Sequence, residues 1–260
     1  MITTELPKRL LPQKCPLCNE PQDIIVNGHF DNGKGEQIAE LDKGYSFCNC
    51  HNIFYTNPNN LQDVYNADYF KRYDNPLSSK CYERYYLDYG ATIKDELGIK
   101  NGAILDIGCI NPTLLNCFKK DGFITYGNDI FNHNLNGHRQ LIGNFETIEI
   151  NEKFDIIWAS HIFEHFLKPI EAIKKCYDLL NNKGVLFVAM PDPFIIDWTA
   201  PYRWGHWCIR EHHILWNMED FCQELEKAGF RIVFKKRNFE YKFICIGDYH
   251  LLAQKVVLEV

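Results

Sequence analysis

Apolar and polar positions in the second half of the chain alternate in two periods, one typical of strands and one typical of helices. Compact apolar runs predict strands over residues 103–108, 123–129, about 141–142, 154–160, 184–190, 230–236 and about 241–256. Helical periodicity predicts helices over residues 112–121, 169–180 and 218–228. Strands that alternate with helices in this way favour an α/β fold with a doubly wound, seven-stranded and mostly parallel sheet.

The run Ala103–Gly108 is the stretch around which this sheet is organised. It ends in Asp106 and Gly108, and a helix start follows, with Asn111 as a good N-cap and Pro112 suited to the first helical position. A strand that turns directly into a helix places its last residues at the carboxyl edge of the sheet. That edge is where open α/β sheets bind their ligands.

A second acid, Asp129, ends the next strand along the chain. An acid in this position can accept hydrogen bonds from both hydroxyls of a ribose, as in dinucleotide folds. The turn after the first strand lacks the G-x-G-x-x-G pattern, because Ile110 and Pro112 stand where small residues are needed. A nucleoside ligand without phosphates therefore fits this edge better than NAD.

Residues 1–60 are predicted to form a small zinc-ribbon-like segment. Cys15 and Cys18 form a C-x2-C pair, and Cys48 and Cys50 follow thirty residues later among polar, glycine-bearing hairpin loops. We expect Cys15, Cys18, Cys48 and Cys50 to bind one structural zinc ion, with His51 as the substitute for Cys50 because its spacing from Cys48 is regular. The alternative is four incidental cysteines in a loop-rich terminus.

Residues 61–100 are rich in tyrosine at helical spacing, which predicts a helical connector or lid before the domain of residues 101–260. Aromatic residues three and four apart are more often a packed helix face than a ligand site. One or two of these tyrosines could still cover a ligand at the sheet edge.

The composition of the chain limits the classes of partner that we expect it to bind. The 260 residues carry a net charge of −6, and no Lys/Arg stripe is present, so nucleic acid is not the expected partner. No apolar run is long enough to cross a membrane and no signal peptide is apparent, which predicts a cytoplasmic protein. The eleven cysteines are then not a disulfide framework.

The stretch His161-Ile162-Phe163-Glu164-His165 follows the fourth strand. It matches the H-x-x-E-H pattern of some metalloproteases, but that motif needs an established helix, and this stretch lies between a buried strand and Pro169. The alternative is that His161 and His165 lie at the carboxyl end of the strand, where a general base can face an acceptor.

The order LDIGC, YGNDI, FDIIWASHIFEHFLKPIEAIKKCYDLLNNKGVLFVAMPDP and EHHILWNMEDFCQELEKAGF resembles class I S-adenosylmethionine-dependent methyltransferases, which have a Rossmann-like sheet. In particular the chain is similar to the branch with an N-terminal zinc-binding segment, which is often found with sugar and surface-polysaccharide biosynthesis. The resemblance covers about residues 13–58 and 100–256.

This resemblance implies a role for several residues in binding S-adenosylmethionine. Asp106 and Gly108, with Cys109 in the same turn, would lie under the methionine portion, and Asp129 would bind the ribose diol. Ile130 would lie against the adenine, Asn144 and Phe145 would flank the base, and Ser160 and His161 would lie near the sulfonium. Glycines expected by the family are replaced by Ile110 and Pro112.

Methyl transfer requires alignment of acceptor and methyl group, and a base when the acceptor is a hydroxyl. The candidate bases are His161 and His165, followed by His206, His212 and His213. The insertion at about 192–217 is aromatic and polar and suits a cover over an acceptor, with Tyr202, His206, Trp207 and His212 as the expected contacts. A lid that only packs on the tyrosine-rich helices is the alternative.

The leading hypothesis is O-methylation of a small glycan precursor or nucleotide-linked sugar. A non-catalytic module that keeps the cofactor fold is the alternative, and nucleic-acid recognition through the zinc segment is a distant third.

Overall fold

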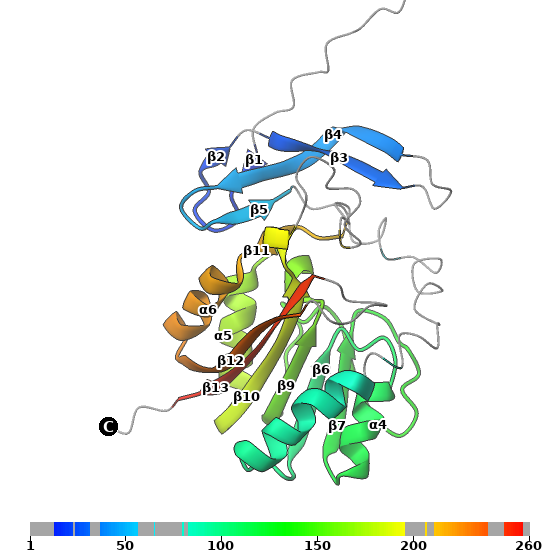
Figure 1. Ribbon diagram of the computed structural model, residues 1–260. Coiled ribbons are helices and arrows are strands. Elements are labelled where there is room, and N and C mark those ends of the chain that lie inside the picture. The colour runs from blue at the N-terminus through cyan, green and yellow to red at the C-terminus, as the bar shows by residue number, and fades with distance from the viewer. Residues whose placement is uncertain are drawn as a thin grey trace, which may run out of the picture.

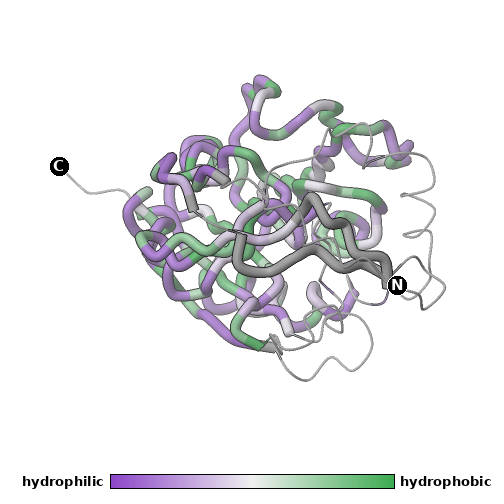
Figure 2. The backbone as a smooth tube through the Cα atoms, turned by 90° about the horizontal axis from the view of Figure 1, so that it is seen from above, coloured by the Kyte–Doolittle hydropathy of each residue, from purple (hydrophilic) through white to green (hydrophobic). Residues whose placement is uncertain are grey.

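The computed structural model describes residues 13–22, 24–31, 37–56, 65, 80, 83–195, 206, 211–238 and 247–256. Within these ranges a large sheet flanked by helices lies below a smaller antiparallel sheet (Figure 1). Hydrophobic and hydrophilic stretches alternate along the backbone (Figure 2), as expected for elements that turn one face to a core. No helix in the described ranges has the length and apolar character needed to cross a bilayer.

The large sheet has seven strands, in the order β12-β13-β10-β9-β6-β7-β8. The strands are β6 (Ala103–Ile107), β7 (Ile124–Asp129), β8 (Arg139–Ile142), β9 (Phe154–Ser160), β10 (Leu180–Pro191), β12 (Phe230–Asn238) and β13 (Asp248–Lys255). Strand β13 runs antiparallel to both of its neighbours, and the other pairings are parallel. The predicted seven-stranded, Rossmann-like sheet is confirmed.

The strand order reverses beside β6. The chain proceeds from β6 to β7 and β8 on one side, and then crosses back to β9 on the other side of β6. The connections that leave β6 and β9 therefore diverge, and a crevice opens between them at the carboxyl ends of the strands.

The helices agree with the predicted ranges to within about two residues. They are α4 (Thr113–Lys120), α5 (Pro169–Leu179) and α6 (Met218–Lys227). Helix α4 begins one residue later than the prediction, because Pro112 is its N-cap residue, but the Asn111 side chain still accepts a hydrogen bond from the Thr113 N–H at 3.1 Å. Two π-helical turns precede the sheet, η1 (Tyr86–Gly90) and η2 (Thr92–Glu96).

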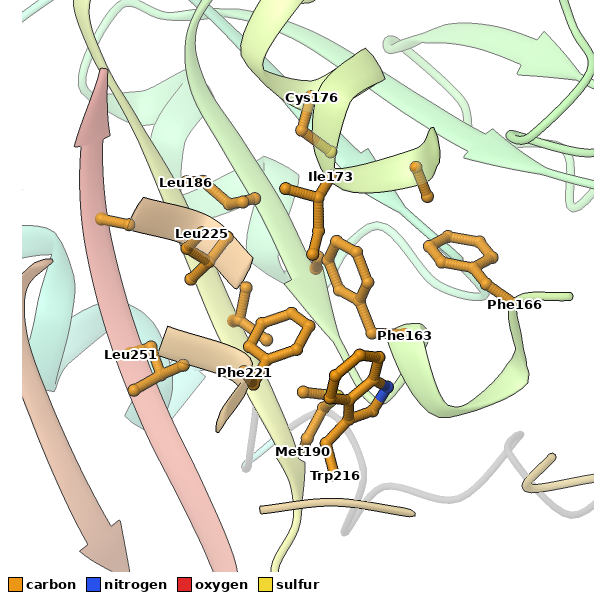
Figure 3. Close-up of a cluster of buried hydrophobic side chains, with 14 of the residues drawn as sticks. Phe163, Phe166, Ile173, Cys176, Leu186, Met190, Trp216, Phe221, Leu225 and Leu251 are labelled. Atoms are coloured by element: carbon orange, nitrogen blue, oxygen red, sulfur yellow. The ribbon is translucent and has the colours of Figure 1, made fainter. Parts of the chain in front are cut away.

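Two apolar cores cover the two faces of the large sheet. On one face, Tyr85 and Tyr89 pack with Phe118 of α4 against Phe187 of β10, so these tyrosines have the packing role that their spacing predicts. On the other face, residues from α5, α6, β10, β13 and the turn after β9 contribute to the cluster drawn in Figure 3. Its rings include Phe163, Phe166, Trp216 and Phe221.

The N-terminal region forms a two-stranded ribbon and a four-stranded antiparallel sheet. The ribbon pairs β1 (Gln13–Lys14) with β2 (Pro21–Gln22), and the sheet has the order β11-β5-β4-β3. Its strands are β3 (Ile24–Asp31), β4 (Gln37–Cys48), β5 (Ile53–Tyr55) and β11 (Ile214–Trp216). The last strand comes from the far end of the predicted insertion, so the two regions share a sheet. The proposed division at residues 60 and 100 stays a prediction.

Candidate functional site

A pocket occupies the crevice beside β6. It encloses about 740 Å³ of empty space, including the part open to solvent. Its walls come from the carboxyl ends of β6, β7, β8 and β9, from the segments that follow them, and from Tyr65, which precedes the large sheet in the chain. The lining residues are Tyr65, Ile107, Gly108, Ile110, Asn128, Asp129, Ile130, Gly143, Asn144, Phe145, Glu146, His161, Ile162, His165, Phe166 and Leu167.

The turn after β6 forms the floor of the pocket at Gly108. This residue has a φ of +74°, and a Cβ there would lie 3.0 Å from Cδ1 of Ile162 on the opposite wall. The N–H groups of Gly108 and Cys109 both donate to the Asn128 carbonyl, at 2.8 and 2.9 Å, which ties the turn to β7. The backbone conformation therefore favours glycine, and a Cβ at this position would push the end of the Ile162 side chain aside by a few tenths of an ångström.

Asp106 and Cys109 lie behind this turn and are not among the residues that line the pocket. Burial raises the pKa of the Asp106 carboxyl from its usual 3.8 to about 7, and the charge of Asp129 adds to this effect. Cys109 is buried and donates its thiol hydrogen to the Asn111 carbonyl at 3.3 Å. Their positions indicate that they support the turn.

Asp129 ends β7 and lines the pocket with Ile130. Its Oδ1 accepts a hydrogen bond from the Phe131 N–H at 2.9 Å and lies 3.1 Å from Nε2 of His133. Both contacts engage the same oxygen and hold the carboxylate at the edge of the sheet.

The loop after β8 supplies the side of the pocket that contains Asn144 and Phe145. The amide of Asn128 donates to the carbonyls of Leu141 and Gly143, at 2.9 and 3.0 Å, and so fastens this loop to β7. Phe145 is buried and presents an apolar ring to the pocket beside a polar amide. Such a wall can hold a flat heteroaromatic ring and bond to its edge.

The end of β9 supplies the opposite wall. His161 adopts a left-handed backbone with a φ of +53°, and a short 3₁₀ turn, η3 (Phe163–His165), follows it. His161 and His165 both line the pocket, whereas Ser160 does not. Because His161 precedes the 3₁₀ turn, His165 ends it, and the two share no α-helix, the helix that the metalloprotease motif needs is absent from this described segment.

His165 contacts Tyr65, which belongs to the tyrosine-rich stretch of residues 61–100, where one or two tyrosines could cover a ligand at the sheet edge. The Tyr65 hydroxyl lies 2.7 Å from Nδ1 of His165. Burial lowers the pKa of His165 below its usual value, although the charge of Glu164 opposes this effect. His165 is therefore neutral at neutral pH and able to take up a proton.

Behind this wall lies a cluster of histidines around two buried carboxylates. Asp248, at the start of β13, has Oδ2 at 3.2 Å from His161 Nε2 and Oδ1 at 2.9 Å from His206 Nε2. Burial raises the pKa of Asp248, but His161 and His206 outweigh burial and hold it below its usual value. Glu164 Oε1 lies 3.5 Å from His161 Nδ1 and 3.9 Å from His212 Nε2.

Of the residues expected to contact an acceptor, His206 and His212 lie in this cluster, and Tyr202 and Trp207 lie outside the described residues. His213 is also buried, but its N–H donates to the Glu164 carbonyl at 2.7 Å. Sequence reasoning missed Asp248. An acid that begins an antiparallel strand reaches the same edge as acids that end parallel ones, and this signal could have identified it.

A separate group of possible metal ligands lies in the N-terminal region. Ligand atoms of Cys15, Cys18, Cys48 and His51 all lie within 4.8 Å of one another. The prediction of Cys50 as the fourth ligand differs from this arrangement, because Cys50 is exposed and stands outside the group. The physical reason is the turn after β4, in which the His51 N–H faces the Cys48 carbonyl at 3.4 Å and brings Nδ1 of His51 to 3.5 Å from Cys48 Sγ.

Comparison with protein families gives a match to the part of the chain that forms this site and its sheet. The model of a family described as a methyltransferase domain matches residues 82–234. This range contains β6 to β11 and every pocket residue except Tyr65.

The curated relatives that match at low identity include two from different organisms. The ubiquinone biosynthesis O-methyltransferase of Histophilus somni (strain 2336) is 24% identical over 175 residues, which cover 61% of this chain and 73% of that protein. A protein of the same description from Coxiella burnetii (strain Dugway 5J108-111) is 29% identical over 107 residues, which cover 36% of this chain and 46% of its own length. The second match therefore spans less than half of that relative.

Solved structures share the fold. A SAM-dependent methyltransferase from Archaeoglobus fulgidus superposes with a TM-score of 0.57 at 17% identity and covers 73% of this chain and 100% of its own. Magnesium protoporphyrin IX methyltransferase from Synechocystis PCC 6803 with bound SAH gives a TM-score of 0.57 at 15% identity, covering 75% of this chain and 98% of its own.

Proposed function

We propose, from the premise that the chain belongs to the methyltransferase domain family, that it methylates a hydroxyl group of a small glycan precursor or nucleotide-linked sugar. That it is an S-adenosylmethionine-dependent methyltransferase, and hence an enzyme, follows from the family and the curated relatives. The acceptor and the roles of individual residues are the proposal. The observation that supports it best is the pocket at the reversal of the strand order, with Asp129 on its rim.

The pocket residues fit the cofactor in both shape and chemistry. Asp129 offers a carboxylate to the ribose hydroxyls, and Ile130 and Phe145 offer apolar surfaces to the adenine, with the Asn144 amide beside them. Gly108 leaves room for the methionine portion, where a Cβ would narrow the pocket. When bound, S-adenosylmethionine supplies a methyl group on a positively charged sulfur.

We assign the proton-accepting role to His165. It is neutral because burial lowers its pKa, and the Tyr65 hydroxyl at 2.7 Å fixes its ring. A neutral imidazole in the pocket wall can take the proton from an acceptor hydroxyl as the oxygen attacks the methyl group. His161, the other predicted base, faces Asp248 and Glu164 and is assigned to acceptor binding.

The proposed acceptor class rests on the polar side chains that line the pocket beyond the residues assigned to the cofactor, which are Glu146, His161 and His165. Carboxylate and imidazole groups that converge on one region suit a ligand with several hydroxyl groups. A phenolic acceptor is the second candidate, because both curated relatives are described as ubiquinone biosynthesis O-methyltransferases. Their names also favour transfer to oxygen.

The test of cofactor binding is calorimetric titration of the purified chain with S-adenosylhomocysteine. We expect one molecule bound per chain, and an Asp129→Ala variant that binds about 10–100-fold more weakly, since hydrogen bonds to a charged group contribute about 1.5–3 kcal/mol. Asp178→Ala, which removes an exposed acid of α5, is the matched control. No measurable binding to the wild-type chain would contradict the proposal.

The acceptor is tested by methyl transfer to two panels, one of nucleotide sugars and glycan fragments and one of catechols and related phenols. Turnover with the first panel supports the leading proposal. Turnover with phenols alone replaces it with the second candidate, and turnover with neither contradicts both.

We also propose a structural zinc ion in the N-terminal region, with the reducing cytoplasm as the compartment that keeps its thiols available. Tetrahedral zinc with Zn–S bonds of about 2.3 Å places two sulfur ligands about 3.8 Å apart. The Sγ atoms of Cys18 and Cys48 are 3.7 Å apart, and the Cys48 Sγ lies 3.5 Å from His51 Nδ1. Three thiolates and one imidazole form a closed set of ligands, which is typical of a structural site.

A further inference from the structure

In the described part of the chain, the two carboxylates behind the pocket wall have no lysine or arginine as an ion-pair partner. Asp248 is 0% exposed and Glu164 is 1% exposed. Their ion-pair partners among these residues are all histidines. Buried carboxylates require compensating positive charge, which histidines or a bound cation can supply.

The two nearest histidines lie as far from the Asp248 carboxylate as neighbouring ligands of one metal ion lie from each other. The Nε2 atoms of His161 and His206 lie 3.2 and 2.9 Å from its two carboxylate oxygens. Ligand atoms of all three residues lie within 4.8 Å of one another. Ligands held about 2.0–2.2 Å from one metal ion, in neighbouring coordination positions, are separated by about 3.0–3.5 Å.

Glu164 explains how the His161 ring would be oriented. Its Oε1 lies 3.5 Å from His161 Nδ1, and neither carboxylate oxygen of Glu164 has a hydrogen-bond partner in the described structure. In the tautomer with its proton on Nδ1, which faces Glu164, His161 turns the lone pair of Nε2 toward Asp248, and both groups can then bind one metal ion. A carboxylate behind a ligating histidine is a recurrent feature of metal sites.

We propose that His161, His206 and Asp248 bind one divalent transition-metal ion, of the Mn²⁺ or Zn²⁺ class, next to the pocket. Two imidazoles and one carboxylate leave coordination positions open for an external ligand. Because His161 also lines the pocket, adjacent oxygens of an acceptor, such as those of a vicinal diol, can occupy these positions. The acceptor role rests on the proposed function, whereas metal binding does not.

Mn²⁺ prefers oxygen and imidazole ligands to thiolates, so binding of Mn²⁺ reports on this site and not on the cysteine cluster. The experiment is calorimetric titration of the full, chelator-stripped chain with Mn²⁺, supported by electron paramagnetic resonance of the bound ion. We expect one Mn²⁺ per chain, and at least tenfold weaker binding to His206→Gln and Asp248→Asn. His138→Gln, which alters a histidine that bonds Thr125 far from the cluster, is expected to bind Mn²⁺ like the wild type.

Binding of S-adenosylhomocysteine by the same variants reports whether each one folds. Asp248 is fully buried, so if Asp248→Asn fails this test, His206→Gln, which changes a partly exposed side chain, carries the comparison. Equal Mn²⁺ affinity in the wild type and His206→Gln overturns the proposal, as does an absence of Mn²⁺ binding by a wild-type chain that binds S-adenosylhomocysteine. Mn²⁺ binding by a chain that fails to bind S-adenosylhomocysteine supports the metal site and contradicts the proposed function.

Discussion

At the scale of single residues, the site combines positions that sequence patterns identify with positions that they miss. Gly108, Asp129 and His161 follow the ends of strands, and short-range patterns locate strand ends well. Tyr65 and Asp248 reach the same edge from distant segments, and the pairing of β13 with β10 brings Asp248 there. An acid at the start of an antiparallel strand is the signal for Asp248, but the local pattern around it does not show in which direction that strand runs.

Asp106 makes the free energy of unfolding depend on pH. Its folded-state pKa of about 7 exceeds its usual 3.8, so the folded state binds the proton more tightly than the unfolded state does. The free energy of unfolding should therefore fall by about 1.4 kcal/mol per pH unit as the pH rises from about 4 to about 7.

Asp106→Asn should remove this slope and stabilise the ligand-free protein at pH 8. Urea denaturation between pH 5 and pH 8 measures the effect, with Asp178→Asn as the exposed control. Parallel pH profiles of wild type and Asp106→Asn would contradict the assignment.

Gly108 can be tested against a second glycine with a positive φ. Gly108→Ala and Gly122→Ala should each lose about 1–2 kcal/mol of stability, because alanine is strained at φ values of +74° and +90°. Only Gly108→Ala places a methyl group against Ile162 in the pocket, whereas Gly122 has open space around it. Calorimetry should therefore show weaker S-adenosylhomocysteine binding for Gly108→Ala alone.

At the scale of elements, the sequence predicts α6 well, because its signals are local. Asn217 caps the helix and accepts a hydrogen bond from the Glu219 N–H at 2.9 Å, while Phe221 and Leu225 face the core. The fourth member of the cysteine cluster is harder to predict. Spacing alone permits either Cys50 or His51, and in the structure the backbone of the turn after Cys48 brings His51 to the three cysteines.

Asn217→Ala should cost about 1 kcal/mol, the usual contribution of an N-cap side chain. In a domain of this size, that loss lowers the melting temperature by about 2–4 °C. Asn217→Ser keeps a capping oxygen and should melt close to the wild type. Equal melting temperatures for wild type and Asn217→Ala in a thermal scan would show that the cap contributes nothing measurable.

At the scale of the whole molecule, the N-terminal sheet and the sheet that forms the pocket are joined by hydrogen bonds as well as by apolar packing. The Thr56 N–H donates to the His213 carbonyl at 2.9 Å, and the His213 N–H donates in turn to the carbonyl of Glu164, in the turn that follows β9, at 2.7 Å. The sequence predicts each sheet from its own pattern. It does not predict the join, since three apolar residues, Ile214–Trp216, give no signal of the sheet to which they belong.

Loss of the proposed zinc ion should therefore be felt at this junction. Cys48→Ser should speed amide hydrogen exchange at Thr56, because β5 follows the metal-binding turn directly. Cys117→Ser, at a half-buried cysteine of α4, should leave that exchange unchanged. Unchanged exchange in Cys48→Ser, or in the wild type after treatment with a chelator, would contradict the structural role of the metal.

The position of β11 has a consequence for biosynthesis. Its residues, Ile214–Trp216, form the outer strand beside β5, more than 150 positions after it in the chain. Domains generally fold as units during translation, starting from the N-terminus. Here the first-made sheet stays one strand short until residue 216 has left the ribosome, so the edge of β5 is exposed on the nascent chain for most of synthesis, a target for chaperones as well as for wrong partners.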